Sequence, residues 1–480
     1  MVARQLCENT SVAELGGAHV LIVGSGLAGL VCARELAAAG LRVTVVTPAR
    51  RGRDGASHRV HGLAPWILLT APVVRGDSPQ RFLGDLRRRG AGLARPGLDE
   101  VFAEQAHAGM EALVRELDLQ PLDDGPVLLP GDEVPRGRRL LPRRHGPLLT
   151  PLVQECEGRG VAIREREVVV GLLSSGGRAS GVISVSRSDA RRHDWHADAV
   201  VLACGGAGAV FPCTTSPRWC CGSGLALAAA TGTLLHHPHL TQALPVTATP
   251  PLFFPTSAAL VKGRLQVDGN AQPPVETLPQ ATTLVAEALR RGKKVELVPP
   301  AVENGSMPPG VRGSAALRRT GPLPLRLALH HSVGGVAVDA WGRTSMPGLY
   351  ACGEAAGGVQ GGRRTMGTGL LEAYIFGTRA ARAVAHDVAK LGPAPAPDAQ
   401  ALVPEPQGVE RLSAALDALL EPLTEIRPPG EVAEALAQLD AWPCDATAVG
   451  GGDAAQTTLR LAAARVMLRS AAAAVGGVGA

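Results

Sequence analysis

A glycine-rich loop near the start of the chain constrains the fold more strongly than any other feature of the sequence. The run His19–Val23 (HVLIV) predicts a buried strand, residues 31–39 place apolar side chains at helical spacing, and Arg42–Val46 (RVTVV) predicts a second strand. The loop 24–29 (GSGLAG) ends the first strand and opens the helix, the context in which a GxGxxG sequence indicates a dinucleotide site. The segment therefore predicts a Rossmann-like strand, helix, strand unit with parallel strands.

Each glycine of this loop has a physical role in holding a pyrophosphate. Gly24 allows the tight turn, Gly26 lets the backbone approach the phosphates, and Gly29 lets the helix pack close to its strand. The N–H groups and the positive end of the helix attract the phosphate charge. Thr47 stands where NAD-binding proteins usually carry an acidic residue, and it offers a single hydroxyl instead. The missing acid argues against NAD as the bound dinucleotide. The predicted dinucleotide-binding residues of this unit are Gly24, Ser25, Gly26, Leu27, Ala28, Gly29 and Thr47.

Composition narrows the class of protein and its partners. The 480 residues allow two or three domains, and 45% hydrophobic with 19% charged residues indicates globular material. Aromatic residues make up only 3%, and the arginine clusters are not interleaved with them, so we expect solvated surface and no nucleic-acid partner. The nine cysteines form no CxxC pair, and the HHPH sequence at 236–239 has no carboxylates at ligand spacing, so no metal site is predicted. Because residues 1–17 contain no signal-peptide core and no apolar run reaches about 18 residues, we expect a cytoplasmic protein without a membrane span.

The rest of the chain divides into segments of different character. Residues 161–187 predict two strands joined at Gly176 and Gly177, part of a β-meander that returns to the main sheet at Asp198–Ala203. The sequence pattern of residues 65–150 does not predict their fold. Further helices are predicted over Asp99–Leu117, Ala281–Arg291 and Leu370–Val384.

Several stretches carry a resemblance to a known family. Residues 330–380 (HHSVGGVAVDAWGRTSMPGLYACGEAAGGVQGGRRTMGTGLLEAYIFGTRA) resemble the flavoproteins of the succinate dehydrogenase, fumarate reductase and L-aspartate oxidase family, with L-aspartate oxidases nearest. Further similarity lies in the GSGLAGL loop, in 203–211 (ACGGAGAVF) and in 213–224 (CTTSPRWCCGSG). The resemblance covers about residues 18–388 and implies that the dinucleotide is FAD.

The resemblance also implies an α/β architecture with substrate held between two domains. We expect a Rossmann-like FAD-binding domain with a β-meander, an inserted α+β capping domain and a small C-terminal helical domain. The expected ranges are 18–232 and 331–388 for the FAD-binding domain, 233–330 for the capping domain, 389–408 for a Pro- and Ala-rich linker, and 409–480 for the helical domain.

The family pattern supplies further candidates for FAD binding. Glu354 can accept hydrogen bonds from ribityl or ribose hydroxyls, and the helix that begins near Leu370, with Thr368 as its cap, can stabilise negative charge on the reduced flavin. The stretch 57–60 (SHRV) resembles the place where succinate dehydrogenases attach FAD through a histidine, but L-aspartate oxidases bind FAD noncovalently, which we expect here; His58 is otherwise a solvated or hydrogen-bonded residue. The additional candidates are Ser57, Gly205, Gly206, Glu354, Gly369, Leu370 and Leu371.

The resemblance further implies carboxylate-binding residues for a dicarboxylate or amino-acid substrate. His330 and Arg364 match family anchors, although Arg363 is an alternative to Arg364. The capping segment departs from the pattern, because family catalytic positions are occupied by Leu244, Ser257, Leu260 and Thr282. The general acid or base is therefore unassigned, with Lys262, Arg264 and the histidines at 236, 237 and 239 as possible substitutes.

The leading expectation is FAD-dependent oxidation of L-aspartate to iminoaspartate, as in the first step of NAD biosynthesis from aspartate, with oxygen or fumarate as electron acceptor. One alternative is a fumarate reductase-like or succinate dehydrogenase-like flavoprotein acting on another substrate. Another is a flavin-binding protein whose catalytic side has decayed. The sequence does not predict the oligomeric state.

Overall fold

The computed structural model describes most of the chain. It covers residues 17–476 apart from 54, 59–65, 123–124, 129–133, 249–259, 261, 300–320, 404, 407–408, 421–428, 443 and 446–452.

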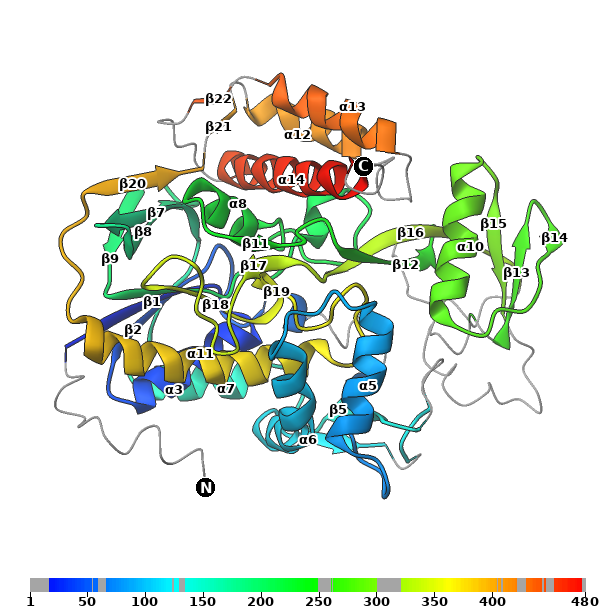
Figure 1. Ribbon diagram of the computed structural model, residues 1–480, viewed down its shortest axis with the longest axis horizontal. Helices are drawn as coiled ribbons and strands as arrows, with labels where there is room; N and C mark the ends of the chain where they lie inside the picture. The colour runs from blue at the N-terminus through cyan, green and yellow to red at the C-terminus, as the bar shows by residue number, and fades with distance from the viewer. Residues whose placement is uncertain are drawn as a thin grey trace.

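A five-stranded parallel sheet forms the centre of the molecule (Figure 1). Its strand order is β18-β10-β1-β2-β6, and every neighbouring pair runs parallel. All five residues of β1 are buried, as expected for a strand covered on both faces. The predicted α/β fold with a Rossmann-like unit is confirmed. The strands are β1 (His19–Val23), β2 (Arg42–Val46), β6 (Ala162–Arg164), β10 (Ala199–Leu202) and β18 (Leu349–Ala351).

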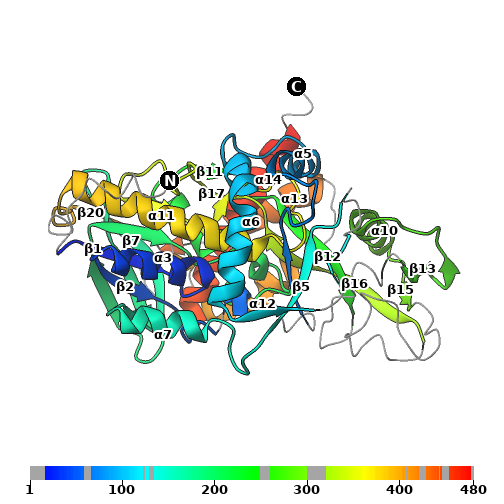
Figure 2. The same cartoon turned by 90° about the horizontal axis from the view of Figure 1, so that it is seen from below.

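Three helices lie side by side on one face of this sheet (Figure 2). They are α3 (Leu27–Ala38), α7 (Thr150–Gly158) and α11 (Gly369–Leu391). A Cβ on Gly377 of α11 would stand 2.7 Å from the carbonyl oxygen of Ala28, so only glycine allows this close packing of α11 on α3. The helix α11 continues past the predicted end at Val384 and stops before Gly392, which has a positive φ.

The predicted β-meander forms a separate four-stranded sheet in the order β20-β7-β8-β9. Gly176 and Gly177 join β7 to β8, and both have positive φ, as a tight hairpin turn requires. The segment predicted as an extended linker contributes β20, because its extended backbone pairs with the edge strand β7. The strands are β7 (Glu167–Ser175), β8 (Arg178–Ser186), β9 (Arg192–His196) and β20 (Ala399–Leu402).

Within residues 66–149, the described part of the chain forms a small antiparallel sheet and the helices α5 and α6. The sheet has the order β3-β5-β4, and Arg139 of β5 lies directly opposite Leu68 of β3. The helix predicted over Asp99–Leu117 is present as α6. The elements are β3 (Ile67–Thr70), α5 (Pro79–Gly90), α6 (Leu98–Glu116), β4 (Leu119–Pro121) and β5 (Gly137–Pro142).

The predicted capping segment forms a lobe with its own hydrophobic core, beyond the central sheet in Figure 1. Its sheet has the order β12-β16-β15-β13-β14. The predicted helix starts three residues early because Thr277 and Gln280 form a capping box. The elements are β12 (Thr241–Thr247), β13 (Arg264–Val267), β14 (Asn270–Ala271), α10 (Leu278–Arg290), β15 (Val295–Val298) and β16 (Leu323–Ser332).

The C-terminal part of the chain is helical, and α14 packs on α8. These helices and η1 share a third hydrophobic core. The predicted division into domains remains a prediction. The remaining elements are η1 (Gly208–Val210), α8 (Ser223–Ala230), β11 (Leu235–His236), β17 (Gly335–Ala337), η3 (Gly353–Ala355), β19 (Ala356–Gly357), β21 (Glu405–Pro406), α12 (Val409–Leu420), α13 (Pro429–Asp440), β22 (Cys444–Asp445) and α14 (Asp453–Gly476).

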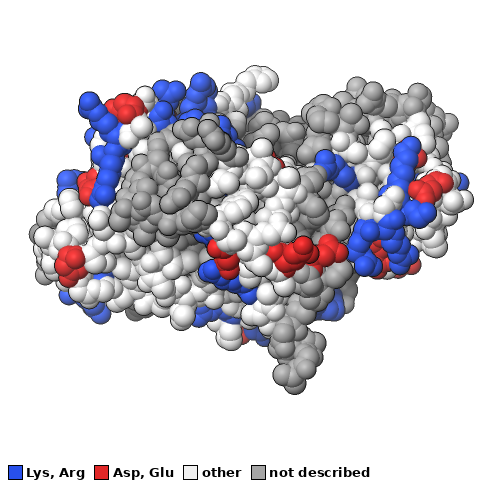
Figure 3. Space-filling model, turned by 90° about the horizontal axis from the view of Figure 1, so that it is seen from above, with Lys and Arg blue, Asp and Glu red and all other residues white. Residues whose placement is uncertain are grey.

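Figure 3 shows charged side chains in a few groups, with acidic residues near basic ones and uncharged surface between the groups. At the end of α5, Arg87 pairs with Asp99 at 2.7 Å and Arg88 pairs with Asp85. Arg87 and Arg88 of the predicted arginine cluster therefore form ion pairs with the protein's own carboxylates.

Candidate functional site

A cavity of about 330 Å³ lies where β1, β2 and β10 end and α3 and α11 begin. Ligands of open α/β sheets bind at this edge, beyond the carboxyl ends of the parallel strands. Gly29, Gly206 and Leu371 are not in its lining, whereas the other predicted residues meet there. Those in the lining are Gly24, Ser25, Gly26, Leu27, Ala28, Thr47, Ser57, Gly205, His330, Glu354, Arg364, Gly369 and Leu370.

The three glycines of the N-terminal loop meet different surroundings. Gly24 has φ +111°, and a Cβ there would stand 2.4 Å from the carbonyl oxygen of Ala203. A Cβ on Gly29 would stand 2.1 Å from the carbonyl oxygen of Gly24. A Cβ on Gly26 would meet only Ser57 Oγ, at 3.8 Å, so this position faces open cavity. The loop thus combines two tight packing points with one open approach, which fits a pyrophosphate.

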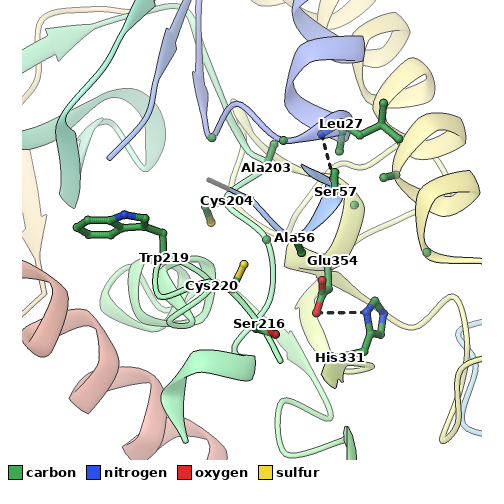
Figure 4. A pocket seen from close by; sticks show the side chains of 18 of the residues that line it. Leu27, Ala56, Ser57, Ala203, Cys204, Ser216, Trp219, Cys220, His331 and Glu354 are labelled. Atoms are coloured by element: carbon green, nitrogen blue, oxygen red, sulfur yellow. Dashed lines mark hydrogen bonds and ion pairs between the residues drawn. The ribbon is translucent and has the colours of Figure 1, made fainter. Parts of the chain in front are cut away.

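The start of α3 presents its backbone N–H groups near this open approach. Gly26 occupies the N-cap position and has no side chain to cap the helix, while the Leu27 N–H donates to Ser57 Oγ at 3.3 Å (Figure 4). A helix N-terminus of this kind attracts phosphate. Behind it, Ser25 Oγ donates to Thr47 Oγ1 at 3.1 Å, so Thr47 is held by the loop itself.

Glu354 is the buried carboxylate of the site. Its Oε1 accepts the N–H of Ser332 at 2.8 Å and lies 3.3 Å from Nδ1 of His331, the contact drawn in Figure 4. Burial raises the pKa of Glu354, but His331, the Ser332 N–H and Arg364 together lower it to about 2, so the carboxylate is ionised at neutral pH. Gly206 makes room for this group, since a Cβ there would stand 2.3 Å from Glu354 Oε1.

The helix α11 points its N-terminus at the same cavity. It begins at Gly369, but the expected cap is wrong: the Thr368 hydroxyl donates backward to the carbonyl oxygen of Thr365 at 2.6 Å and does not cap the helix. Leu370 lines the cavity, whereas Leu371 is fully buried in the main core. The backbone N–H groups of this first turn therefore need another acceptor, and an anionic flavin ring fits that requirement.

Sequence reasoning missed Glu372 in the first turn of α11. The side chain is buried, and its Oε2 accepts from Gln360 Nε2 at 2.9 Å. Burial raises the pKa of Glu372 to about 7. An acid at the fourth position of an otherwise apolar helix start was the signal available in the sequence.

Arg364 and His330 both line the cavity, and the charge of Arg364 acts on the His330 ring. Arg363 is exposed, so Arg364 is the arginine that lines the cavity, and its Nε lies 3.4 Å from Oε1 of Gln242. Among the described residues, no carboxylate lies within ion-pair distance of Arg364. Nδ1 of His330 lies 2.8 Å from the Thr215 hydroxyl. Burial and the Arg364 charge lower the pKa of His330 to about 3, so its ring is neutral at neutral pH.

The positions that depart from the family pattern have ordinary structural roles where the structure describes them. Leu244 lines the cavity while packing in the core of the capping lobe, and Leu260 is fully buried in that core. Thr282 lies on α10, where its hydroxyl donates to the carbonyl oxygen of Leu278 at 2.9 Å. Ser257 lies outside the described residues.

The proposed substitutes and the alternative FAD attachment point lie elsewhere. Lys262 and Arg264 are exposed, and His58 does not line the cavity. His236 contacts the carbonyl oxygen of Leu93 at 2.9 Å, and His239 contacts the Ser470 hydroxyl at 2.8 Å. In the part of the chain that the structure describes, no cluster of three His, Cys, Asp or Glu residues is placed to hold a metal ion, and no helix is both long and apolar enough to cross a membrane.

Comparison with known proteins identifies the family. The FAD binding domain family matches residues 19–271 and 283–370. An L-aspartate oxidase of Streptomyces coelicolor is 30% identical over 434 residues, covering 79% of this chain and 71% of the relative. A CoM/CoB fumarate reductase chain of Methanothermobacter marburgensis is 26% identical, covering 76% of this chain and 72% of the relative.

A solved structure supports the fold. A chain of E. coli quinol fumarate reductase superposes with a TM-score of 0.78 at 18% identity, covering 95% of this chain and 89% of that one. The predicted cofactor and family are confirmed. The chain therefore belongs to the FAD binding domain family and is an FAD-dependent oxidoreductase of the succinate dehydrogenase and fumarate reductase flavoprotein group.

Proposed function

We propose that the chain oxidises L-aspartate, or a closely related small carboxylate, at the end of the cavity that holds Arg364 and His330. The observation that carries this proposal is the guanidinium of Arg364 in the cavity wall, which has no ion-pair partner among the described residues. Burial lowers the pKa of Arg364, but an arginine remains charged at neutral pH. Such a cation recognises a carboxylate through paired hydrogen bonds. The L-aspartate oxidases among the relatives support the choice of substrate.

The surrounding residues have positioning roles in this proposal. Gln242 contacts both Nε and the carbonyl oxygen of Arg364, which orients the guanidinium. The His330 ring is neutral, is held by the Thr215 hydroxyl and lines the same cavity. FAD, when bound noncovalently by the glycine loop, Glu354 and the start of α11, supplies the two-electron acceptor. Oxygen or fumarate then receives the electrons, and the product from aspartate is iminoaspartate.

A second candidate is oxidation or reduction of another acid by the same site. Leu244 favours it, because an apolar side chain lines the cavity where the family pattern has a histidine. Loss of a general acid or base costs about 10²- to 10⁴-fold in rate. A substrate whose reaction needs no general acid or base from the capping lobe would therefore suit this cavity better.

Anaerobic reduction of the bound flavin tests the proposal. Bleaching of the flavin absorbance by L-aspartate, and not by succinate, is the expected result. Arg364→Gln should weaken the response to aspartate by about 10- to 100-fold, since it removes a charge-assisted hydrogen bond, whereas Arg363→Gln removes an exposed neighbouring charge and serves as the matched control. Flavin that dithionite bleaches but neither acid reduces would reject both dicarboxylate substrates and favour a decayed catalytic side.

A further inference from the structure

A second arginine lines the same cavity from a different part of the fold. Arg139 lies on β5 of the small antiparallel sheet, and Trp66, Leu68 and Val127 of that region join it in the lining. The guanidinium of Arg139 lies over the Trp66 ring, with 5.3 Å between its central carbon and the ring centroid. Neither residue belongs to the FAD-binding loop or to the capping lobe.

Strand pairing places Arg139 at the end of the cavity that holds Arg364. Arg139 lies directly opposite Leu68, so the two side chains share one face of the sheet. Leu68 in turn lies against Gly367, whose added Cβ would stand 3.0 Å from Leu68 Cγ. The carbonyl oxygen of Gly367, three residues after Arg364, accepts the N–H of Thr70 at 3.1 Å. The β3–β5 sheet therefore forms the wall next to the loop that carries Arg364.

An arginine that contacts an aromatic ring can still bind an anion. The cation–π contact is made with the charge of the guanidinium, and its N–H donors can also bind a carboxylate. Contact with Trp66 restricts the motion of the Arg139 side chain, which reduces the entropy lost when a carboxylate binds. Leu68 and Met366 line the same cavity, and their apolar side chains suit a short hydrocarbon chain.

We propose that Arg139 is the second carboxylate-binding residue of this site, so that a dicarboxylate spans from Arg364 to Arg139. This inference rests on the proposed function, which requires Arg364 to hold the first carboxylate. It places a carboxylate-binding residue on the β3–β5 sheet, whereas the capping lobe has Leu244 at the position of a family histidine. Arg139 is accordingly a specificity-determining residue that distinguishes dicarboxylates from monocarboxylates.

Binding of two four-carbon acids to the FAD-loaded protein tests this assignment. Succinate and butyrate differ by one carboxylate, and their binding is measured by perturbation of the flavin spectrum and by calorimetry. The wild type should bind succinate at least about tenfold more tightly than butyrate, and Arg139→Gln should weaken succinate by about 10- to 100-fold while changing butyrate less than about threefold. Arg138→Gln removes an exposed charge from the adjacent position of β5 and should change neither acid.

Arg139→Lys covers the case in which glutamine destabilises the sheet. Lysine keeps the charge but loses the planar fork, so a loss confined to succinate is again expected. Equal weakening of both acids by Arg139→Gln and by Arg139→Lys, or no weakening of either, would overturn the assignment. If the wild type binds succinate and butyrate equally and Arg364→Gln weakens the binding of both, the role of Arg139 is overturned and that of Arg364 stands. Binding of neither acid would overturn the proposed function as well.

Discussion

Nδ1 of His331 lies 3.3 Å from Oε1 of Glu354, and the same oxygen accepts the Ser332 N–H at 2.8 Å. These contacts keep the buried carboxylate ionised, because together with Arg364 they outweigh the effect of burial on its pKa. An ionised carboxylate at the cavity wall is a strong acceptor for hydroxyl groups. The arrangement supports the prediction that Glu354 binds FAD.

Glu354→Gln should therefore weaken FAD binding. The amide keeps the size of the side chain but removes its charge, at a cost of about 1.5–3 kcal/mol, or roughly 10- to 150-fold in affinity. Titration of the apoprotein with FAD, followed by quenching of flavin fluorescence, measures the change. The control is Glu111→Gln, an exposed glutamate of α6 with 61% side-chain exposure. An unchanged dissociation constant would show that Glu354 does not contact FAD.

Alanine at two positions of the glycine loop should have different effects, one on FAD binding and the other on stability. Gly26→Ala adds a methyl group into open cavity, so the fold should lose less than about 1 kcal/mol at this N-cap position while FAD binding falls sharply. Gly24→Ala instead combines φ +111° with a 2.4 Å approach to the carbonyl oxygen of Ala203. That variant should unfold at a lower temperature even without FAD. Thermal unfolding of both apoproteins, together with their flavin content, separates the two effects, and a stable Gly24→Ala protein would contradict this interpretation of the loop.

The features that sequence could predict are those carried by contiguous residues. The loop at 24–29 lies between its own strand and helix, and Glu354, Leu370 and Arg364 fall within one stretch that resembles the family. These stretches were enough to predict the cofactor, through the family resemblance, and β1, β2 and β10 of the central sheet, whereas β6 was assigned to the β-meander.

The features that escaped prediction depend on distant pairings. Arg139 reaches the cavity only because β5 pairs with β3, which contacts the loop at Gly367. The segment 389–408 was predicted as a linker because the partner of its strand β20 is the edge strand β7, which is distant in the sequence. Thr368 had the right residue type for a cap, but the carbonyl oxygen of Thr365 competes for its hydroxyl.

Glu372 should make stability depend on pH. Burial raises its pKa to about 7 from the usual 4.5, so the folded state holds a proton that the unfolded state releases between these values. The contribution of Glu372 to the free energy of unfolding is therefore fully present at pH 4.5. It falls by about 3 kcal/mol as the pH rises to about 7. Glu372→Gln keeps an acceptor for Gln360 and removes this dependence. The difference in unfolding temperature between the variant and the wild type should grow from pH 5 to pH 8, and a constant difference would contradict the raised pKa.

Arg136 should be essential for folding of residues 65–150. Its side chain is 1% exposed, and its Nε and Nη2 bind the two carboxylate oxygens of Asp77 at 2.7 and 2.9 Å, while Nη1 pairs with Asp85. Arg136→Met leaves two buried carboxylates without this partner, which should cost about 3–5 kcal/mol in the free energy of unfolding. Urea unfolding measures the loss, with exposed Arg138→Met as the matched control. Adding Asp77→Asn and Asp85→Asn to the Arg136 variant should recover part of the loss, because neutral amides are less costly to bury than unpaired charges. A single variant as stable as its control would mean that the ion cluster contributes little to the fold.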